Sequence, residues 1–216
     1  LVVNGNSFMI NGMNWDMIPI GKDAVNTNFW NKSDELIKAG LELEMSLLKQ
    51  MNVNAIRHYS DIPSKWVQYI FENYGIYTML NHSFGRYGLT INGVWEPITD
   101  YSNDDTQKVL LSEIETLVNK YKNTPGLLLY LLGNENNYGL FWSGAETEDF
   151  PEEESKKKAV GEKYGRPMYK LMNLAAKKIK ELDSNHPVAI CNGDDLFIDI
   201  VAEECRDIDI FGVNSY

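Results

Sequence analysis

Asn134 and Glu135 are the residues whose types and place in the sequence suggest chemistry most directly. They follow six consecutive apolar residues, 127–132, and Gly133, so an amide and a carboxylate stand where a buried segment ends. A carboxyl group beside an amide can transfer a proton while the amide binds a hydroxyl group. Taken alone, however, a Glu after an apolar run is more often part of a solvated loop. Its interpretation depends on the rest of the chain.

Other polar and aromatic residues stand at comparable places, directly after short apolar segments. The candidates chosen in this way are Asn14, Arg57, His58, Asn192, Asp194 and Tyr216. Amides, carboxylates and basic side chains bind hydroxyl groups, and flat aromatic rings pack against the apolar faces of sugars. Trp95 and Trp142, each in a long loop, fit a sugar platform and simple loop packing equally well. These residue types together indicate a neutral carbohydrate as the ligand.

The intervening segments predict the elements that would position these residues. Short apolar segments predict strands at residues 13–16, 53–56, 76–80, 127–132, 188–191 and 208–213. Apolar residues at helical spacing predict helices over residues 33–51, 63–74, 104–121, 168–182 and 197–205, the first with a break at Gly40. A long loop is expected after the third strand. Strand and helix alternate about six times, which is typical of parallel β/α folds.

Polar or aromatic residues end each of the six predicted strands. In a doubly wound sheet only the strands near the topological switch point contribute to a site, whereas a barrel brings the carboxyl ends of all strands to one rim. The sequence therefore predicts an α/β fold, a (β/α)8 TIM barrel of which this chain contains about the first six β/α units. At 216 residues we expect a single domain, 1–216, with a hairpin over 1–12 and a long rim insertion over 138–166.

The composition argues against several classes of protein. A formal net charge of -11 without a concentrated basic patch argues against a nucleic-acid partner. No apolar run approaches the roughly 20 residues that span a bilayer, and the chain, which starts at Leu1, contains no signal peptide. Cys191 and Cys205 are too few for a disulfide framework and are expected to be reduced and packed. The histidines lack metal-ligand spacing and the glycines lack a phosphate-binding pattern, so neither a metal nor a cofactor is expected.

Four motifs together resemble the catalytic barrel of clan A glycoside hydrolases, most closely glycoside hydrolase family 2. They are Gly-Met-Asn-Trp at residues 12–15, Arg57, Leu-Gly-Asn-Glu-Asn at 132–136, and Asn-x-Tyr at 214–216. The resemblance covers nearly the whole chain, and the Asn-Glu motif is its most specific part.

This resemblance implies roles for individual residues. Glu135 would be the general acid/base, and Asn134 would bind the 2-hydroxyl group of the sugar. Arg57 and Tyr216 would support the nucleophile, although Arg57 also fits a buried arginine paired with a carboxylate. The remaining candidates match less closely and are expected to line the substrate site: Asn14, His58, Trp142, Asn192 and Asp194.

One departure from the family pattern concerns the nucleophile, which is a Glu at the end of the seventh strand, whereas the predicted elements end with the sixth. We therefore expect a fragment, inactive alone, of a retaining β-glycosidase that hydrolyses O-glycosidic bonds of oligo- or polysaccharides. The alternative is a non-catalytic carbohydrate-binding or surface structural protein with a degenerate glycosidase barrel. The resemblance also favours an extracellular or periplasmic location and leaves room for flanking domains.

Overall fold

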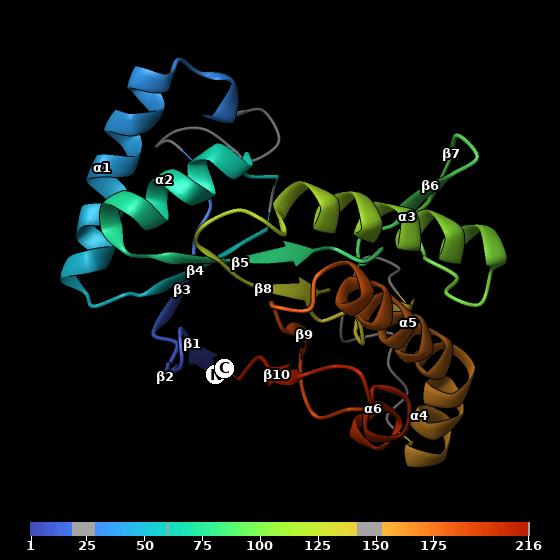
Figure 1. Ribbon diagram of the computed structural model, residues 1–216. Coiled ribbons are helices and arrows are strands. Elements are labelled where there is room, and N and C mark those ends of the chain that lie inside the picture. Colours follow the sequence, from blue (N-terminus) through green and yellow to red (C-terminus); the bar gives the residue numbers. More distant parts are fainter. Residues whose placement is uncertain (19–28, 60, 142–152, 216) are drawn as a thin grey trace. The chain divides into compact units, whose positions relative to one another are not determined.

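The computed structural model describes residues 1–18, 29–59, 61–141 and 153–215. The chain folds into two compact units. The first comprises Leu1–Leu80 and Asn123–Leu128, and the second comprises Asn81–Lys122 and Leu129–Tyr216. Two strands labelled in Figure 1, β5 (Tyr77–His82) and β8 (Leu127–Leu132), have residues in each unit.

Six parallel strands form the main sheet. Besides β5 and β8 these are β3 (Gly12–Asn14), β4 (Ala55–His58), β9 (Val188–Asn192) and β10 (Ile210–Val213), in the order β3-β4-β5-β8-β9-β10. The pairings of β3 with β4, β4 with β5, β8 with β9 and β9 with β10 are parallel. Each connection between successive strands of this sheet contains a helix, as β/α crossovers require. The predicted parallel β/α architecture is confirmed.

In the described part of the first unit, the ends of two α-helices agree with the prediction to within one residue. The elements of this unit besides the sheet are α1 (Asp34–Gln50), α2 (Ser64–Tyr74), the 3-10 helix η1 (Phe29–Asn31), and a hairpin of β1 (Val2–Val3) and β2 (Asn6–Ser7). Ser33 caps α1, because its side chain accepts a hydrogen bond from the backbone N–H of Leu36 at 3.4 Å. Gly75 ends α2 in the left-handed conformation, with a φ of 69°.

The predicted break of the first helix at Gly40 is wrong, because α1 continues through this residue. A Cβ at Gly40 would lie 2.9 Å from the Cζ atom of Phe29 and 3.0 Å from the Cε atom of Met17. Gly40 therefore makes room for neighbouring side chains. The propensity cost of one interior glycine, about 1 kcal/mol, is small enough for tertiary packing to outweigh it.

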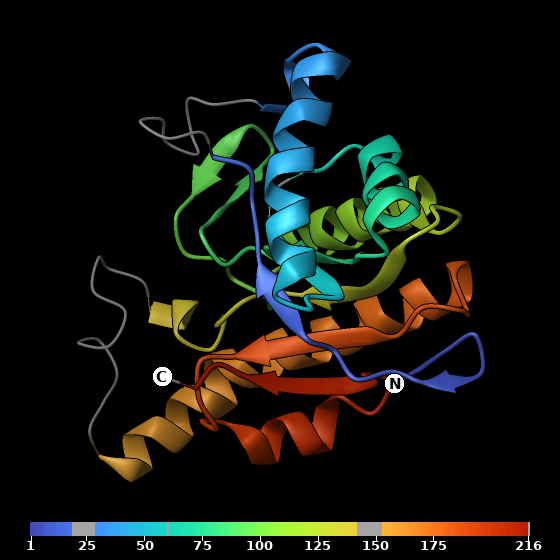
Figure 2. The same cartoon turned by 90° about the vertical axis from the view of Figure 1, so that its left-hand side faces the viewer.

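The second unit contains most of the helices. They are α3 (Asp104–Tyr121), η2 (Gly139–Phe141), α4 (Glu154–Val160), the π-helical η3 (Gly161–Gly165), α5 (Arg166–Leu182) and α6 (Ile198–Glu204). The ends of α3 match the prediction, because Asn103 caps it by accepting hydrogen bonds from two backbone N–H groups. α4, η3 and α5 form one helical run (Figure 2). α5 packs against both α3 and α6.

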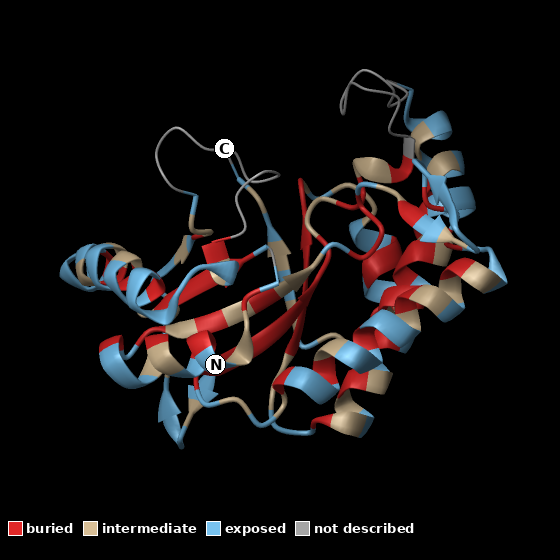
Figure 3. Ribbon diagram, turned by 90° about the horizontal axis from the view of Figure 1, so that it is seen from above, coloured by how far each residue is buried: buried red, intermediate tan, exposed pale blue. Residues whose placement is uncertain are grey.

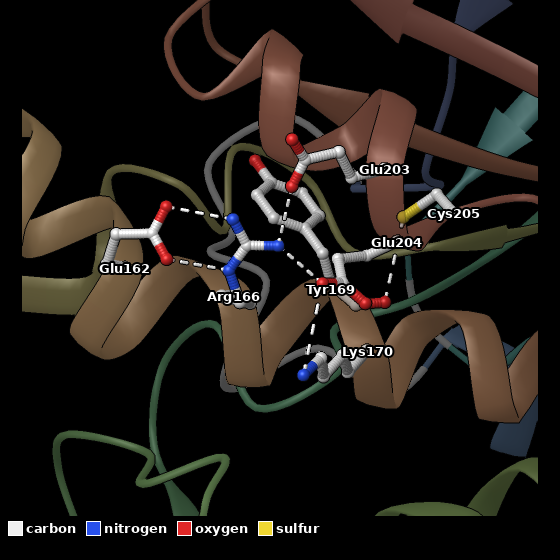
Figure 4. A network of polar contacts seen from close by, with 7 residues as sticks. All are labelled: Glu162, Arg166, Tyr169, Lys170, Glu203, Glu204 and Cys205. Carbon is white, nitrogen blue, oxygen red and sulfur yellow. Dashed lines mark hydrogen bonds and ion pairs between the residues drawn. The ribbon is translucent and has the colours of Figure 1, made fainter.

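A polar network joins the start of α5 to α6 (Figure 4). The guanidinium group of Arg166 donates to Glu162 from Nε at 2.7 Å and from Nη2 at 2.8 Å. Its Nη1 donates to Glu203 at 2.8 Å and also to Glu204. These hydrogen bonds, first of all those to Glu162, raise the pKa of Arg166 above its ordinary value. The side chain is therefore always charged, and it connects η3, α5 and α6.

The long loop expected after the third strand contains a hairpin that was not predicted from the sequence. β6 (Leu89–Ile91) pairs antiparallel with β7 (Val94–Glu96) around Asn92 and Gly93, whose φ angles are 52° and 82°. Two successive residues with positive φ are typical of a type I′ turn, for which Asn-Gly is the preferred sequence. The signal was therefore present in the sequence.

Burial in the structure follows the apolar segments (Figure 3). Every residue of β8 is buried, as its six apolar residues predict. Trp66 of α2 is buried, and Cys191 and Cys205 are buried thiols that form no disulfide bond. Leu174 of α5 fits the apolar helical spacing in the sequence but is exposed in the structure. No helix within the described ranges is both long and apolar enough to cross a membrane.

Candidate active site

The turn that follows β8 contains Asn134 and Glu135. Gly133 has a φ of 81°, and a Cβ at this position would overlap the side chain of Asn136, so glycine is required here. The Oδ1 atom of Asn136 accepts a hydrogen bond from the backbone N–H of Asn134 at 2.9 Å. The Asn136 side chain thus closes the turn as a local backbone partner would.

Glu135 has a φ of 56°, in the left-handed region that residues other than glycine seldom adopt. Its backbone N–H donates to the carbonyl oxygen of Cys191 in β9 at 2.8 Å, and its own carbonyl accepts from the N–H of Tyr138 at 2.9 Å. These bonds stabilise a conformation that would otherwise cost of order 1 kcal/mol or more. The carboxyl group accepts a hydrogen bond from the side-chain amide of Asn214, which directly follows β10.

Asn136 also connects this turn to the segment after β5. Its Nδ2 donates to the carbonyl oxygens of Ser83 at 3.2 Å and Phe84 at 3.0 Å, and to the hydroxyl of Tyr101 at 3.2 Å. The Tyr101 hydroxyl donates in turn to the Phe84 carbonyl at 2.8 Å. Burial raises the pKa of Tyr101, so this hydroxyl keeps its proton and remains a donor. Asn136 is therefore a structural anchor beside Glu135.

The predicted residues Asn192 and Asp194 lie at the end of β9 and form hydrogen bonds within the protein. The Oδ1 atom of Asp194 accepts from Nδ2 of Asn137 at 2.9 Å and from the N–H of Leu196 at 3.0 Å. The Oδ1 atom of Asn192 accepts from the hydroxyl of Tyr169 at 3.1 Å. Burial raises the pKa of this hydroxyl as well, which keeps it a donor. Both residues stabilise the turn between β9 and α6.

In the first unit, the predicted residues Asn14, Arg57 and His58 lie in one cluster. Nδ1 of the fully buried His58 is 3.2 Å from Oδ1 of Asp16, whose Oδ2 accepts from the backbone N–H of Tyr59 at 3.3 Å. The hydroxyl of Tyr59 donates to Oδ1 of Asn14 at 3.4 Å. The guanidinium carbon of Arg57 is 4.6 Å from the centroid of the Tyr59 ring. Asp16 and Tyr59 thus join all three predicted residues at the ends of β3 and β4.

Two predicted site residues, Trp142 and Tyr216, lie outside the described residues. Asp16, Tyr59 and Asn214 were not among the site residues predicted from the sequence. Asp16 ends a predicted strand, Tyr59 follows the candidate His58, and Asn214 is the first residue of the Asn-x-Tyr motif. Position at a strand end was therefore the available signal, but it did not specify which side chains hydrogen bond.

No metal-binding cluster accompanies these residues in the part of the chain that the structure describes. No three His, Cys, Asp or Glu side chains there are grouped so that they could hold a metal ion. Burial raises the pKa of the Cys205 thiol to about 12, so this sulfur remains protonated and is neither a nucleophile nor a thiolate ligand at neutral pH.

These features define a class of protein, a parallel β/α barrel domain with a carboxylate and amides at the carboxyl ends of its strands. Comparison with known protein families then identifies the family within this class. The model of the glycosyl hydrolases family 2 TIM barrel domain matches residues 1–210. The chain belongs to this family, and both the predicted TIM-barrel fold and the predicted family resemblance are confirmed.

Individual relatives match this chain over a small part of their own length. A beta-galactosidase of Lactococcus lactis subsp. lactis (strain IL1403) is 29% identical over 143 residues, which are 64% of this chain and 12% of the relative. A probable 1,3-beta-glucanosyltransferase of Saccharomyces cerevisiae (strain ATCC 204508 / S288c) is 32% identical over 90 residues, 40% of this chain and 16% of the relative. The apo structure of Bacteroides uniformis beta-glucuronidase 3 superimposes with a TM-score of 0.60 at 18% identity, covering 99% of this chain and 21% of that one.

Proposed function

We propose that the intact protein containing this chain is a retaining β-glycosidase in which Glu135 is the general acid/base. The observation that supports this most is the place of Glu135 in a family 2 barrel domain, in the turn that directly follows β8, with its carboxyl group hydrogen bonded to Asn214. The names of the relatives, a beta-galactosidase and a beta-glucuronidase, support O-glycosidic bonds as the substrate class.

In the first half of the proposed reaction, the protonated carboxyl group of Glu135 donates its proton to the glycosidic oxygen. A second carboxylate attacks the anomeric carbon, so that the bond from carbon to the leaving oxygen breaks and a glycosyl ester forms. In the second half, ionised Glu135 accepts a proton from water, and that water releases the sugar from the ester. As the family resemblance implies, we expect the second carboxylate to lie outside residues 1–216.

The other site residues support this chemistry by binding. We propose that Asn134 binds the 2-hydroxyl group of the sugar, and that Arg57 and Tyr216 support the nucleophile. Asn14 and His58, held together through Asp16 and Tyr59, would contact the sugar at the ends of β3 and β4. Trp142 remains a candidate sugar platform.

Replacing Glu135 tests this proposal. In the intact protein, Glu135→Gln should lower kcat/KM for phenyl β-glycosides by about 10²- to 10⁴-fold, the usual contribution of general acid catalysis. Adding azide to Glu135→Ala should release β-glycosyl azide, because an anionic nucleophile attacks the glycosyl ester without needing a base. The matched control is Glu115→Gln, which changes a carboxylate paired with Lys178 at 2.8 Å on the surface. Unchanged hydrolysis by Glu135→Gln would refute the proposal.

Glycosyl transfer is a second candidate, favoured by the match to a probable 1,3-beta-glucanosyltransferase. It shares the first half-reaction, but a sugar hydroxyl instead of water attacks the glycosyl ester. Chromatography of products from an oligosaccharide substrate distinguishes the two, since transfer lengthens part of the substrate pool while hydrolysis only shortens it.

A further inference from the structure

Asn214 connects three strands at their carboxyl ends in the second unit. Its backbone N–H donates to the carbonyl oxygen of Asn192 at 2.8 Å, which fixes the main chain after β10 beside β9. Its Nδ2 donates to Oε1 of Glu135, and the same nitrogen is 3.4 Å from Oδ1 of Asn134. Its Oδ1 accepts a hydrogen bond from the thiol of Cys191 in β9 at 3.0 Å. Both ends of the amide are thus engaged by the protein.

These contacts determine which way the amide points. A thiol donates a hydrogen bond and an ionised carboxylate only accepts one, so the amide oxygen belongs beside Cys191 and the amide nitrogen beside Glu135. The reversed amide would place its oxygen against the carboxyl oxygens of Glu135 and its NH₂ group against the sulfur. Cys191 therefore orients Asn214, and Asn214 in turn fixes the carboxyl group of Glu135.

We propose that Asn214, oriented by Cys191, is a positioning residue for the acid/base Glu135, an inference that rests on the proposed function. A retaining mechanism requires Glu135 to alternate between its protonated and its ionised form. The neutral NH₂ group of Asn214 can donate to Oε1 in both forms, whereas a cationic donor would favour only the ionised one. Because the NH₂ group cannot accept a proton, the bond to Oε1 also assigns the transferred proton to Oε2.

Kinetics with a series of leaving groups tests this role. Protonation matters for a poor leaving group such as phenolate and matters little for 2,4-dinitrophenolate, which departs as a stable anion. In the intact protein, Asn214→Ala and Asn214→Asp should each lower kcat/KM about 10- to 100-fold for phenyl glycosides. For dinitrophenyl glycosides the loss should stay below about 3-fold, because the bond to this leaving group breaks without protonation by Glu135. A mainly structural role would lower both values equally.

The chain offers a matched asparagine as a control. Asn173 also uses both ends of its amide, donating to Asp207 at 2.9 Å and accepting from the N–H of Asp207 at 2.8 Å. Asn173→Ala should therefore leave the ratio of the two kcat/KM values unchanged. A uniform loss in the Asn214 variants, or no loss, would overturn the proposal.

Cysteine variants test the orienting step separately. Cys191→Ala should show the same dependence on leaving group as Asn214→Ala, about 3- to 10-fold with phenyl glycosides, since the amide loses its orienting donor. Cys191→Ser keeps a donor and should restore most of the activity. Cys205→Ala removes the other buried thiol, which donates to the carbonyl oxygen of Tyr169, and should not change the ratio. A Cys191→Ala variant with the parental ratio would overturn the orienting role.

Failure of this inference is distinguishable from failure of the proposed function. Glu135→Gln is measured in parallel with the same substrates. If Glu135→Gln retains hydrolysis, the acid/base assignment is wrong, and the proposed positioning role of Asn214 is then wrong as well. If Glu135→Gln loses hydrolysis of phenyl glycosides while Asn214→Ala does not, only the positioning role is wrong.

Discussion

Glu135 and Asn136 give the turn after β8 two distinct properties. Glu135 has a left-handed backbone with its carboxyl group bound to Asn214, whereas Asn136 is buried and holds the turn to the segment after β5. A reacting carboxyl group must keep its geometry to within a fraction of an ångström. The side-chain amide of Asn136 holds the turn rigid without taking part in proton transfer.

Asp183 is a buried carboxylate that has no part in the proposed chemistry. Its Oδ2 accepts from the hydroxyl of Tyr130 at 2.9 Å and lies 2.7 Å from Nδ1 of His186. Its Oδ1 accepts from the backbone N–H of Asn185 at 3.0 Å. Burial raises the pKa of Asp183, but the hydrogen bonds from Asn185, His186 and Tyr130 together outweigh it, so the pKa lies below its usual value.

The lowered pKa of Asp183 predicts how stability depends on pH. Its stabilising contribution is present above the pKa of an unfolded Asp, about 3.9, and is lost as the pH falls through the lower pKa of the folded state. Asp183→Asn should therefore lower the melting temperature at pH 7, and the difference from the parent should shrink below about pH 4. Thermal unfolding of both proteins between pH 7 and pH 3 measures this. A difference that is constant over that range would contradict it.

At the level of elements, turns that need positive φ angles determine where several strands begin and end. Gly126, with a φ of 90°, precedes β8, and its carbonyl oxygen accepts from the N–H of Thr78 at 2.8 Å. A Cβ there would overlap the side chain of Phe71, whereas a Cβ at Gly75 would meet nothing within 4 Å. These two glycines share the backbone requirement but differ in the space available.

Substituting each glycine separates backbone strain from steric overlap. Gly75→Ala should cost about 1 kcal/mol of unfolding free energy, the usual penalty for alanine in a left-handed conformation. Gly126→Ala should cost at least about 3 kcal/mol, because it adds the repacking of Phe71 to the same penalty. Guanidinium-induced unfolding of the two variants measures the difference. Equal losses would show that Phe71 moves away without cost.

Sequence predicted the elements best where their signals are local. The ends of α3 followed from its apolar face, and β8 from six apolar residues. The predicted helix break at Gly40 was wrong because the sequence does not show that Phe29 packs against this glycine. The hairpin of β6 and β7 was not predicted, although Asn92-Gly93 is the same turn signal as Asn4-Gly5 in the hairpin of β1 and β2.

At the level of the whole molecule, the chain is an acidic family 2 TIM-barrel domain that spans 12% of the length of its beta-galactosidase relative. A retaining reaction needs two carboxyl groups on opposite sides of the glycosidic bond. Glu135 supplies one of them in the proposed mechanism.

In the proposed mechanism the second carboxylate lies outside residues 1–216, so these residues expressed alone should release no phenol from phenyl β-glycosides, whereas the intact protein should. Even if Glu135 protonates the leaving oxygen, no glycosyl ester can form without the second carboxylate. Parallel assays at equal molar concentration test this, with circular dichroism to establish that the shorter chain is folded. Turnover by the folded short chain would place both carboxylates within residues 1–216.

The sequence by itself determined the alternation of strands and helices, the buried β8 and the place of Asn134 and Glu135 after it. These are local properties, since apolar periodicity shows which residues are buried and a strand end shows where polar residues become accessible. Only the tertiary structure decided that Asn214, 79 residues after Glu135, donates to its carboxyl group, and that Cys191 orients that amide. Such bonds depend on the register of β8, β9 and β10 and on side-chain rotamers, which no local pattern specifies.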